Sequence, residues 1–511
     1  MRVRIWVGLV LCAGFMGRGQ TNSFNARTRF LSLHECIEVA LARNLDLQIE
    51  HLKADIAADY LSESYGVYVP IFTTGARHDF ISQSGDFDPK KSGVDFPYEL
   101  DSDTFTSSLA GRLPFGLSYN LNGDAGEKTA RTDFNFNTNT ASGFFFGVRQ
   151  TNDFFAQAGL TARQHLLRDF WIDQDSTTIR LRRKDLKISQ QTLRFQVMKT
   201  ILAVELAYYD LVAARENIRV QDKALELRRQ LVAETRRRVE VGDVPQLESD
   251  QAETQLQNTL TAAAATREIF SSRQNALKRL LTDDFKAWVD LDLEPTDALA
   301  AAPVRTDRAA SFLNAMKNRP DLIEARLAVE KSDVVVKFRF NQLFPTLDAL
   351  AGYGSQTIAN DYSSALGEAF RFRDPNYYYG VVLSFPLYPL SERGHYRASK
   401  GEKALAELQL KEAEQDILVE VADLVNRIES RFSQVGSTRK ARAYAEAALD
   451  AEQKKMVNGL STGFFVLQLQ ETLTAARTAE VLALADYDRV LAQLAFAEGG
   501  ILERHRLKIG E

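Results

Sequence analysis

Between Val197 and Val239 every seventh residue is aliphatic, and this row constrains the fold more than any other feature of the chain. Its members are Val197, Val204, Leu211, Ile218, Leu225, Val232 and Val239. A strict seven-residue apolar repeat of this length is typical of a coiled-coil seam. A helix over residues 184–241 would be roughly 80 Å long at about 1.5 Å per residue, deeper than any ordinary globular core. The sequence therefore predicts a rod or barrel of long helices.

A parallel row is small or apolar for only half of this distance. It runs through Leu193, Thr200, Ala207 and Ala214 and then gives way to Gln221 and Arg228. We therefore expect the helix to pack less closely towards its far end.

Composition excludes some classes of function and indicates a compartment. The 511 residues carry a net charge of −5, so no basic surplus points to a nucleic-acid partner. Arg2 and Arg4 precede the apolar run 5–16, which predicts a secretory signal peptide over residues 1–20. The alternative is a buried N-terminal helix. The two cysteines, Cys12 and Cys36, predict no internal disulfide, and neither follows a small residue as an acylated cysteine would.

The second half of the chain repeats the first. Asp46 matches Asp321 and Pro70 matches Pro345, both at an offset of 275 positions. Internal repeats of this kind decide the architecture before individual elements do. We therefore expect two copies, residues 31–283 and 311–503, joined by an external Pro-, Ala- and Asp-rich linker over 284–310.

Each copy is expected to contain a helix, a strand pair and a long helical hairpin. The strands are predicted within 71–167 and 346–387, and the hairpins over 180–281 and 396–501. In the first copy, residues 104–122 hold extra β-like sequence, as an added hairpin or as part of longer strands. Gly242 is predicted to take a left-handed helix cap, and Ser461 to cap the second return helix.

Each copy contains too few strands to close a barrel, and the unpaired backbone groups of an open sheet edge are too costly in lipid. Aromatic clusters such as 144–146 and 377–379 suit a membrane interface. The chain must therefore oligomerise if its strands enter a membrane, and the signal peptide favours the outer membrane of a bacterium.

Several short motifs follow one another in a fixed order. They begin at residue 31 with LSLHECIEVAL, followed by NRPDL from Asn318, SFPL from Ser384 and the two glycine turns at Gly242 and Gly459. In this order the motifs resemble the TolC family of outer-membrane efflux proteins over nearly the whole mature chain. The chain departs from the family's QPLLRG run, since it has QHLLRD from Gln164.

The resemblance implies a mainly α fold with a transmembrane β part. It implies a homotrimer in which a β-barrel of four strands per chain, twelve in all, is shared between three chains. Coiled-coil hairpins form a long periplasmic α-helical barrel. Its open end docks a periplasmic adaptor (membrane fusion protein) bound to an inner-membrane pump of the RND, ABC or a similar class. The expected location is the outer membrane, in contact with its lipid.

The tunnel mouth is expected at the helix tips. Family members carry acidic residues six and nine positions after the second glycine, where this chain has Phe465 and Gln468. An apolar ring gates by dewetting, and a carboxylate ring attracts cations. We therefore predict an aromatic gate from Phe464 or Phe465, with negative charge from Glu248 and Asp250. The alternatives are that Phe465 packs between helices and that Glu248 is a solvated charge at a helix start.

The glycine turns are the adaptor contacts that the resemblance implies. The residues concerned are Gly242, Asp243, Gly459, Leu460 and Ser461. Each glycine could equally serve only to end a helix, and both roles are compatible.

Nothing in the sequence predicts catalysis, a cofactor or a metal. The run Gly459–Gly463 matches the G-x-S-x-G pattern, but a helix rather than a strand is expected to enter it. The six histidines show no metal-binding spacing. We therefore predict a porin-like outer-membrane duct for tripartite efflux or type I secretion, with passive transport. The alternative is a periplasmic coiled-coil scaffold or adaptor that stays outside the membrane.

Overall fold

The structure is a computed structural model that describes residues 27–84, 97–133, 147–242, 244–458 and 460–507. The predicted signal peptide, the 144–146 aromatic cluster, Asp243 and Gly459 lie outside these residues. The chain divides into two compact units. A helical unit comprises residues up to 55, 187–327 and from 408, and a sheet unit comprises 56–186 and 328–407.

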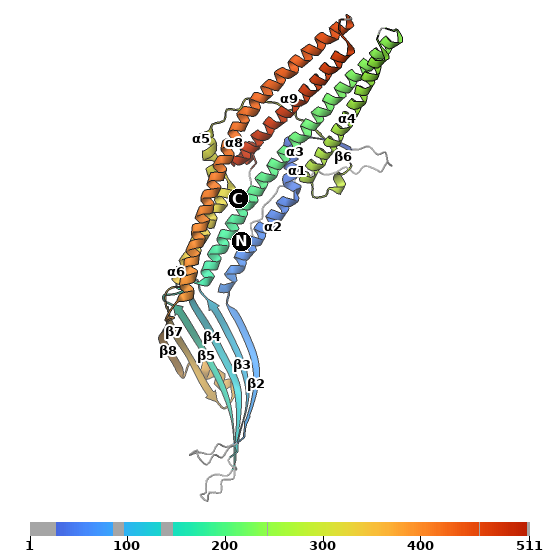
Figure 1. Cartoon of the computed structure of the whole chain (residues 1–511). Helices are drawn as coiled ribbons and strands as arrows, with labels where there is room; N and C mark the ends of the chain where they lie inside the picture. Colours follow the sequence, from blue (N-terminus) through green and yellow to red (C-terminus); the bar gives the residue numbers. More distant parts are fainter. Residues whose placement is uncertain (1–26, 85–96, 134–146, 243, 459, 508–511) are drawn as a thin grey trace, which may run out of the picture. The chain divides into compact units, whose positions relative to one another are not determined.

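Two long antiparallel helical hairpins dominate the helical unit, α3 with α4 and α8 with α9 (Figure 1). The helices of the chain are α1 (Leu33–Arg43), α2 (Leu45–Ser64), α3 (Gln174–Glu240), α4 (Gln246–Leu281), α5 (Arg308–Asn318), α6 (Pro320–Asn341), α7 (Tyr362–Phe370), α8 (Leu390–Val457), α9 (Gly463–Ala497) and α10 (Ile501–Arg504). α3 contains 67 residues and α8 contains 68.

The seven-residue row on α3 forms part of the core. Five of its seven members are buried, namely Val197, Val204, Leu211, Leu225 and Val232, and the other two are half-buried. A matching row on α8 is buried at Val421, Ile428, Val435, Leu449 and Met456. The charged member of that row, Arg442, pairs with Glu480 of α9, with 2.6 Å between Nε and Oε2. The coiled-coil prediction is confirmed.

Burial along α3 becomes sparser towards its far end, as expected, but the second row is still packed at Arg228. Arg228 is only 6% exposed, and its Nη1 donates a 3.2 Å hydrogen bond to the carbonyl oxygen of Leu467 on α9. Burial lowers the pKa of the guanidinium, and the negative charge of Glu471 opposes that shift. The aliphatic part of the Arg228 side chain packs between α3 and α9, while its guanidinium group hydrogen-bonds to a backbone carbonyl.

The two copies have equivalent local structure. α1 and α5 begin and end 275 positions apart, and Ala40 and Ala315 are both buried. Each of these alanines accepts a hydrogen bond from the backbone N–H of the residue that ends its helix, Asn44 or Arg319. α1 opens with the expected capping box between Ser32 and Glu35.

The segment over 284–310 is not only an external linker. It contains the 3₁₀ turn η2 (Lys286–Trp288) and the strand β6 (Leu291–Pro295), which pairs in parallel with β1 (Arg27–Leu31). Trp288 and Leu293 are buried in the core around α1, α3 and α4. Burial of these large apolar side chains holds the segment against the helices.

The sheet unit holds one six-stranded antiparallel sheet in the order β2-β3-β4-β5-β7-β8 (Figure 1). The strands are β2 (Ile71–Gln83), β3 (Tyr98–Arg112), β4 (Leu117–Asp133), β5 (Val148–His165), β7 (Thr346–Ala359) and β8 (Pro375–Ser384), and η1 (Tyr65–Tyr68) precedes them. The sheet therefore has six strands among the described residues, two more than the four per chain that the family resemblance implies for the barrel. The extra β-like sequence forms an added hairpin, β3–β4, between β2 and β5.

The junction between β5 and α3 takes its shape from polar contacts. Asp169 has a positive φ of 65°, its N–H donates to Asn341 Oδ1 at 2.9 Å, and its Oδ1 accepts from Gln342 Nε2 at 2.6 Å. β5 ends at His165 and α3 begins at Gln174, so the strand is shorter, and the helix longer, than the sequence predicted. These hydrogen bonds define the turn without the proline of the family motif.

None of the helices in the described part of the chain combines the length and the apolar character needed to cross a membrane.

Candidate functional site

The hairpin turns end the two long helix pairs, and the first turn is built as the sequence predicted. Gly242 has a φ of 77°, and its N–H donates to the carbonyl of Val239 at 3.0 Å. This left-handed conformation strains any residue with a Cβ, so glycine suits the position. Pro245 precedes α4 as its N-cap residue.

The second turn differs from the prediction. Thr462, not Ser461, is the N-cap of α9. The Ser461 hydroxyl instead donates a 2.6 Å hydrogen bond to Glu452 Oε1 on the outgoing helix α8. Ser461 therefore ties the turn back to α8. Since a helix leads into this turn, the G-x-S-x-G pattern here lacks the strand that a nucleophile elbow requires.

The bond from Ser461 makes the turn sensitive to acid. The hydrogen bond from Ser461, followed by that from Lys455, lowers the pKa of Glu452. A carboxyl group with a lowered folded pKa stabilises the fold above its unfolded pKa, and this contribution is lost as the pH falls through the folded pKa.

We expect Ser461→Ala to raise amide exchange at the end of α8 at pH 7, because Glu452 loses its hydrogen bond. As the pH falls through the lowered folded pKa of Glu452, the variant and the parent protein should approach each other, since protonation removes the same interaction. Hydrogen exchange expressed as protection factors at pH 7 and at low pH measures this. Thr462→Ala is the control, because its side chain makes no capping bond. A difference between variant and parent that persists unchanged at low pH would contradict the assignment.

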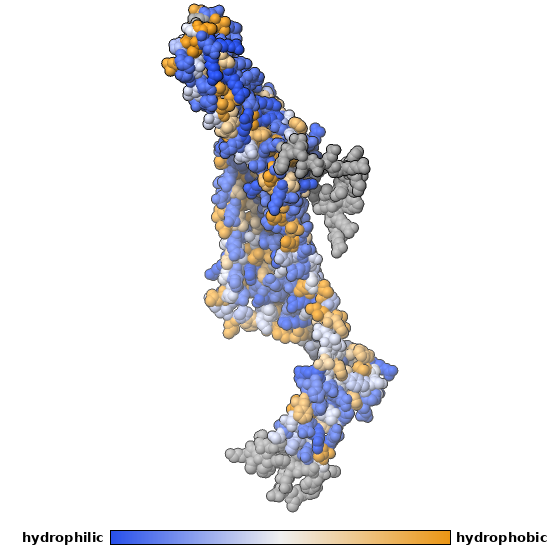
Figure 2. Space-filling model, turned by 90° about the vertical axis from the view of Figure 1, so that its right-hand side faces the viewer, coloured by the Kyte–Doolittle hydropathy of each residue, from blue (hydrophilic) through white to orange (hydrophobic). Residues whose placement is uncertain are grey.

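A groove between α4 and α9 brings together three of the predicted gate residues. It has a volume of about 570 Å³. Asp250 lines it from α4, and Phe464 and Gln468 line it from α9. Gln246 Nε2 donates to Asp250 Oδ1 at 3.0 Å. Figure 2 shows apolar side chains among hydrophilic ones at this end of the helical unit.

The other two predicted gate residues lie beside the groove. Phe465 is 52% exposed, and its ring meets that of Phe464 edge-on with 5.7 Å between centroids. Glu248 is half-buried, and its Oε2 lies 3.6 Å from the position that a Cβ on Gly463 would take. This carboxylate is therefore near the start of α9 as well as in the first turn of α4, where helix dipoles favour negative charge.

Sequence reasoning missed Glu471, which adds a second carboxylate to the groove. Its spacing from Phe464 and Gln468 follows one face of a helix, so the 3.6-residue period could have identified it. Val466 and Gln470 occupy the opposite, buried face of α9. The groove is therefore acidic and partly aromatic, and it contains no cofactor-binding motif.

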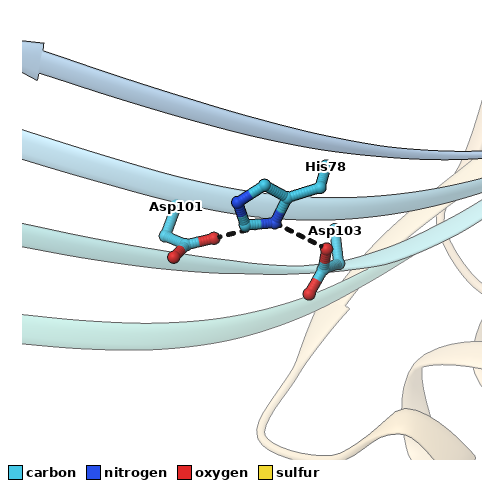
Figure 3. A group of neighbouring side chains, drawn as sticks. All are labelled: His78, Asp101 and Asp103. Atoms are coloured by element: carbon cyan, nitrogen blue, oxygen red, sulfur yellow. Dashed lines mark hydrogen bonds and ion pairs between the residues drawn. The ribbon is translucent and has the colours of Figure 1, made fainter.

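One group of possible metal ligands lies in the sheet unit. His78 of β2 approaches Asp101 and Asp103 of β3, at 3.4 Å and 2.9 Å from Nδ1 (Figure 3). Strand pairing brings them together, which sequence spacing could not show. All three are exposed, and such groups are common on protein surfaces without a metal. The group therefore does not establish a metal site.

Comparison with known proteins gives a consistent family. A family model described as outer membrane efflux protein matches residues 313–500. Outer membrane efflux protein BepC of Brucella suis is 22% identical over 60% of this chain and 64% of its own length. Outer membrane protein TolC of Vibrio cholerae is 24% identical over 66% of this chain and 74% of its own. The match thus spans less than two thirds of the Brucella protein.

Solved structures share the fold. The CmeC outer membrane channel of Campylobacter jejuni has a TM-score of 0.65 and 15% identity, over 92% of this chain and 86% of its own. CusC has a TM-score of 0.65 and 16% identity, over 92% of both chains. The family model, the curated relatives and the solved structures with this fold are all outer membrane efflux proteins or outer membrane channels, and this chain is similar to them.

Proposed function

We propose that this protein is the outer-membrane duct of a tripartite efflux or type I secretion system and that it carries cargo passively. The observation that carries the proposal is the sheet, which exposes many large apolar side chains and leaves β2 and β8 each with one unpaired edge among the described strands. Exposed apolar side chains are unfavourable in water but suit lipid, and unpaired sheet edges must be covered in lipid.

Three chains would close this sheet into a barrel and assemble their helical hairpins into a periplasmic tunnel. The hairpin ends are the contact for an adaptor joined to an inner-membrane pump. Exposed apolar side chains at these ends support such a contact, since they lie in the turns or beside them. They are Val241, Leu247, Val457, Leu460, Phe464 and Phe465. Gly242 and Ser461 shape the turns that present them, and Asp243 and Gly459 complete the proposed contact.

Planar lipid bilayers test the duct directly. Protein purified from outer membranes should insert and give discrete, long-lived conductance steps. A protein that leaves the bilayer electrically silent under all conditions of voltage and salt would contradict the proposal and favour a periplasmic scaffold.

The gate is the second part of the proposal, and it predicts an effect at Phe465. Three copies of this half-exposed ring, with Phe464 beside it, would narrow the tunnel mouth and hinder wetting. We expect Phe465→Ala to raise single-channel conductance severalfold. Leu469→Ala, on the same helix but packed against the core, is the matched control and should leave conductance unchanged. Equal conductance in Phe465→Ala and the parent protein would rule out the aromatic gate.

Glu248 is expected to set the charge preference of the mouth. Replacing it with glutamine removes three carboxylates from the trimer while keeping the size of the side chain. The preference for cations over anions should fall, and the reversal potential in a salt gradient measures it. Glu253→Gln, whose carboxylate pairs with Arg236, provides the comparison. An unchanged reversal potential would place Glu248 outside the conducting path.

A further inference from the structure

In the added hairpin, β3 and β4 each direct a large apolar residue to one side of the sheet and a small or polar residue to the other, as the neighbouring strands do at the same level. Register pairing aligns one large apolar residue from each of the six strands in a single row. The row is Phe72, Leu109, Leu121, Leu160, Tyr353 and Tyr377. All six are exposed, from 37% for Leu109 to 71% for Tyr377. A surface of this kind is suited to lipid.

The adjoining row on the opposite face is entirely small or polar. It consists of Thr73, Ser108, Asn122, Gly159, Gly354 and Asn376, again one residue from each strand. Apolar residues that alternate with polar ones along every strand are typical of the wall of a transmembrane barrel with an aqueous lumen. β3 and β4 follow this alternation at these two rows, while Asp101 and Asp103 of β3 lie further along the same face as Leu109, next to His78 of β2.

The hairpin is also fixed at its turn. Gly116 takes a φ of 85°, and a Cβ there would lie 2.9 Å from the carbonyl oxygen of Asp169. Gln164 Nε2 of β5 donates to the carbonyl of Phe115 at 2.9 Å. Arg112 pairs with Asp175 of α3 at 2.9 Å. These contacts join the turn to the junction between β5 and α3, so the hairpin is built into the sheet.

We propose that β3 and β4 are wall strands and that three chains close a barrel of eighteen strands, six from each. This inference rests on the proposed trimeric duct. Because six is even, β2 and β8 run in opposite directions, so β8 of one chain can pair antiparallel with β2 of the next. All edges are then covered, as lipid requires.

The extra strands change what the duct can pass. Barrel diameter grows roughly in proportion to strand number, so the barrel is about half as wide again as the twelve-stranded one that the family resemblance implies. The opening through the membrane is then not the narrowest point. The helix tips then limit the size of the cargo, and bulkier cargo can pass through the duct once the tips open.

Site-specific quenching tests the placement of the hairpin. Single cysteines at Leu121 and Asn122 carry a bimane fluorophore, and cysteines at Phe72 and Thr73 on β2 are the matched pair. The native Cys36 does not compete, because it is fully buried and burial raises the pKa of its thiol to about 12. We expect brominated phospholipid to quench positions 72 and 121 severalfold more than 73 and 122, and aqueous iodide to show the reverse.

The quenching experiment distinguishes failure of the strand placement from failure of the proposed function. Lipid quenching at position 72 but not at 121 would leave the duct standing and overturn the placement of β3–β4 in the wall. Lipid quenching at neither position would contradict the proposed function itself. Electron cryomicroscopy of the particle in nanodiscs then counts the strands, and twelve strands in place of eighteen would overturn the proposal.

Discussion

Replacing Leu160 with arginine is expected to prevent most of the protein from reaching its assembled membrane form. Leu160 is exposed on the apolar face of β5, in the middle of the row shared by all six strands. A charged residue on the lipid face costs about 2–4 kcal/mol near the bilayer centre, and a trimer incurs this cost three times. The yield of heat-modifiable oligomer in outer-membrane fractions measures the effect.

Thr161→Arg is the matched control. Thr161 is the next residue of the same strand, and it faces the other side between Asn120 and Gly352. Its arginine would point into the lumen, where water solvates the charge, so assembly should be close to that of the parent protein. Equal assembly of the two variants would mean that the row through Leu160 does not face lipid.

His505→Ala is expected to destabilise the helical unit by about 3–5 kcal/mol, since it leaves a buried charge without its partner. Glu205 on α3 is completely buried, and its Oε1 pairs with His505 Nε2. Its other oxygen has no hydrogen-bond partner among the described residues. The carboxylate thus depends on His505, and the midpoint of thermal unfolding followed by circular dichroism should fall.

A double variant separates loss of the pair from loss of packing. Glu205→Leu combined with His505→Ala removes both polar partners and should recover most of the stability, because replacing a buried polar pair with apolar residues is often neutral. If the double variant were less stable than His505→Ala alone, the pair would not account for the loss.

The helical architecture could be predicted from the sequence because its physical signals are local and periodic. The aliphatic row from Val197 places a buried stripe on one helix, and Ser32 with Glu35 marks a helix start by a contact within one turn. Gly242 ends a helix because glycine alone adopts its φ without strain. Because the second half repeats the first at a constant offset, the same helical interpretation applies to it.

The remaining features depend on partners far away in the sequence. The sequence does not decide between an added hairpin and longer strands, because strand pairing and register are set by contacts between segments, not by local composition. β6 escaped prediction because its parallel partner, β1, is more than 250 residues away. Arg228 looked like a break in the apolar row, and only the carbonyl of Leu467 on another helix explains its burial.

The gate site was partly accessible to sequence reasoning. Asp250, Phe464 and Gln468 do line one groove. Serine favours the N-cap position, so the sequence predicts Ser461 there, yet its hydroxyl donates to a more distant acceptor, Glu452. In the proposed trimer, the residues that face Phe465 come from other chains, so local sequence signals do not identify them.

The most direct test of the central claim is the apparent mass of the protein extracted by detergent from an outer-membrane fraction, before and after boiling. A species of about three times the chain mass that dissociates only on boiling is the predicted result. It would establish the trimer on which the duct, the gate and the eighteen-stranded barrel depend. A monomer or dimer recovered from the periplasmic fraction would contradict the account and leave a soluble scaffold in its place.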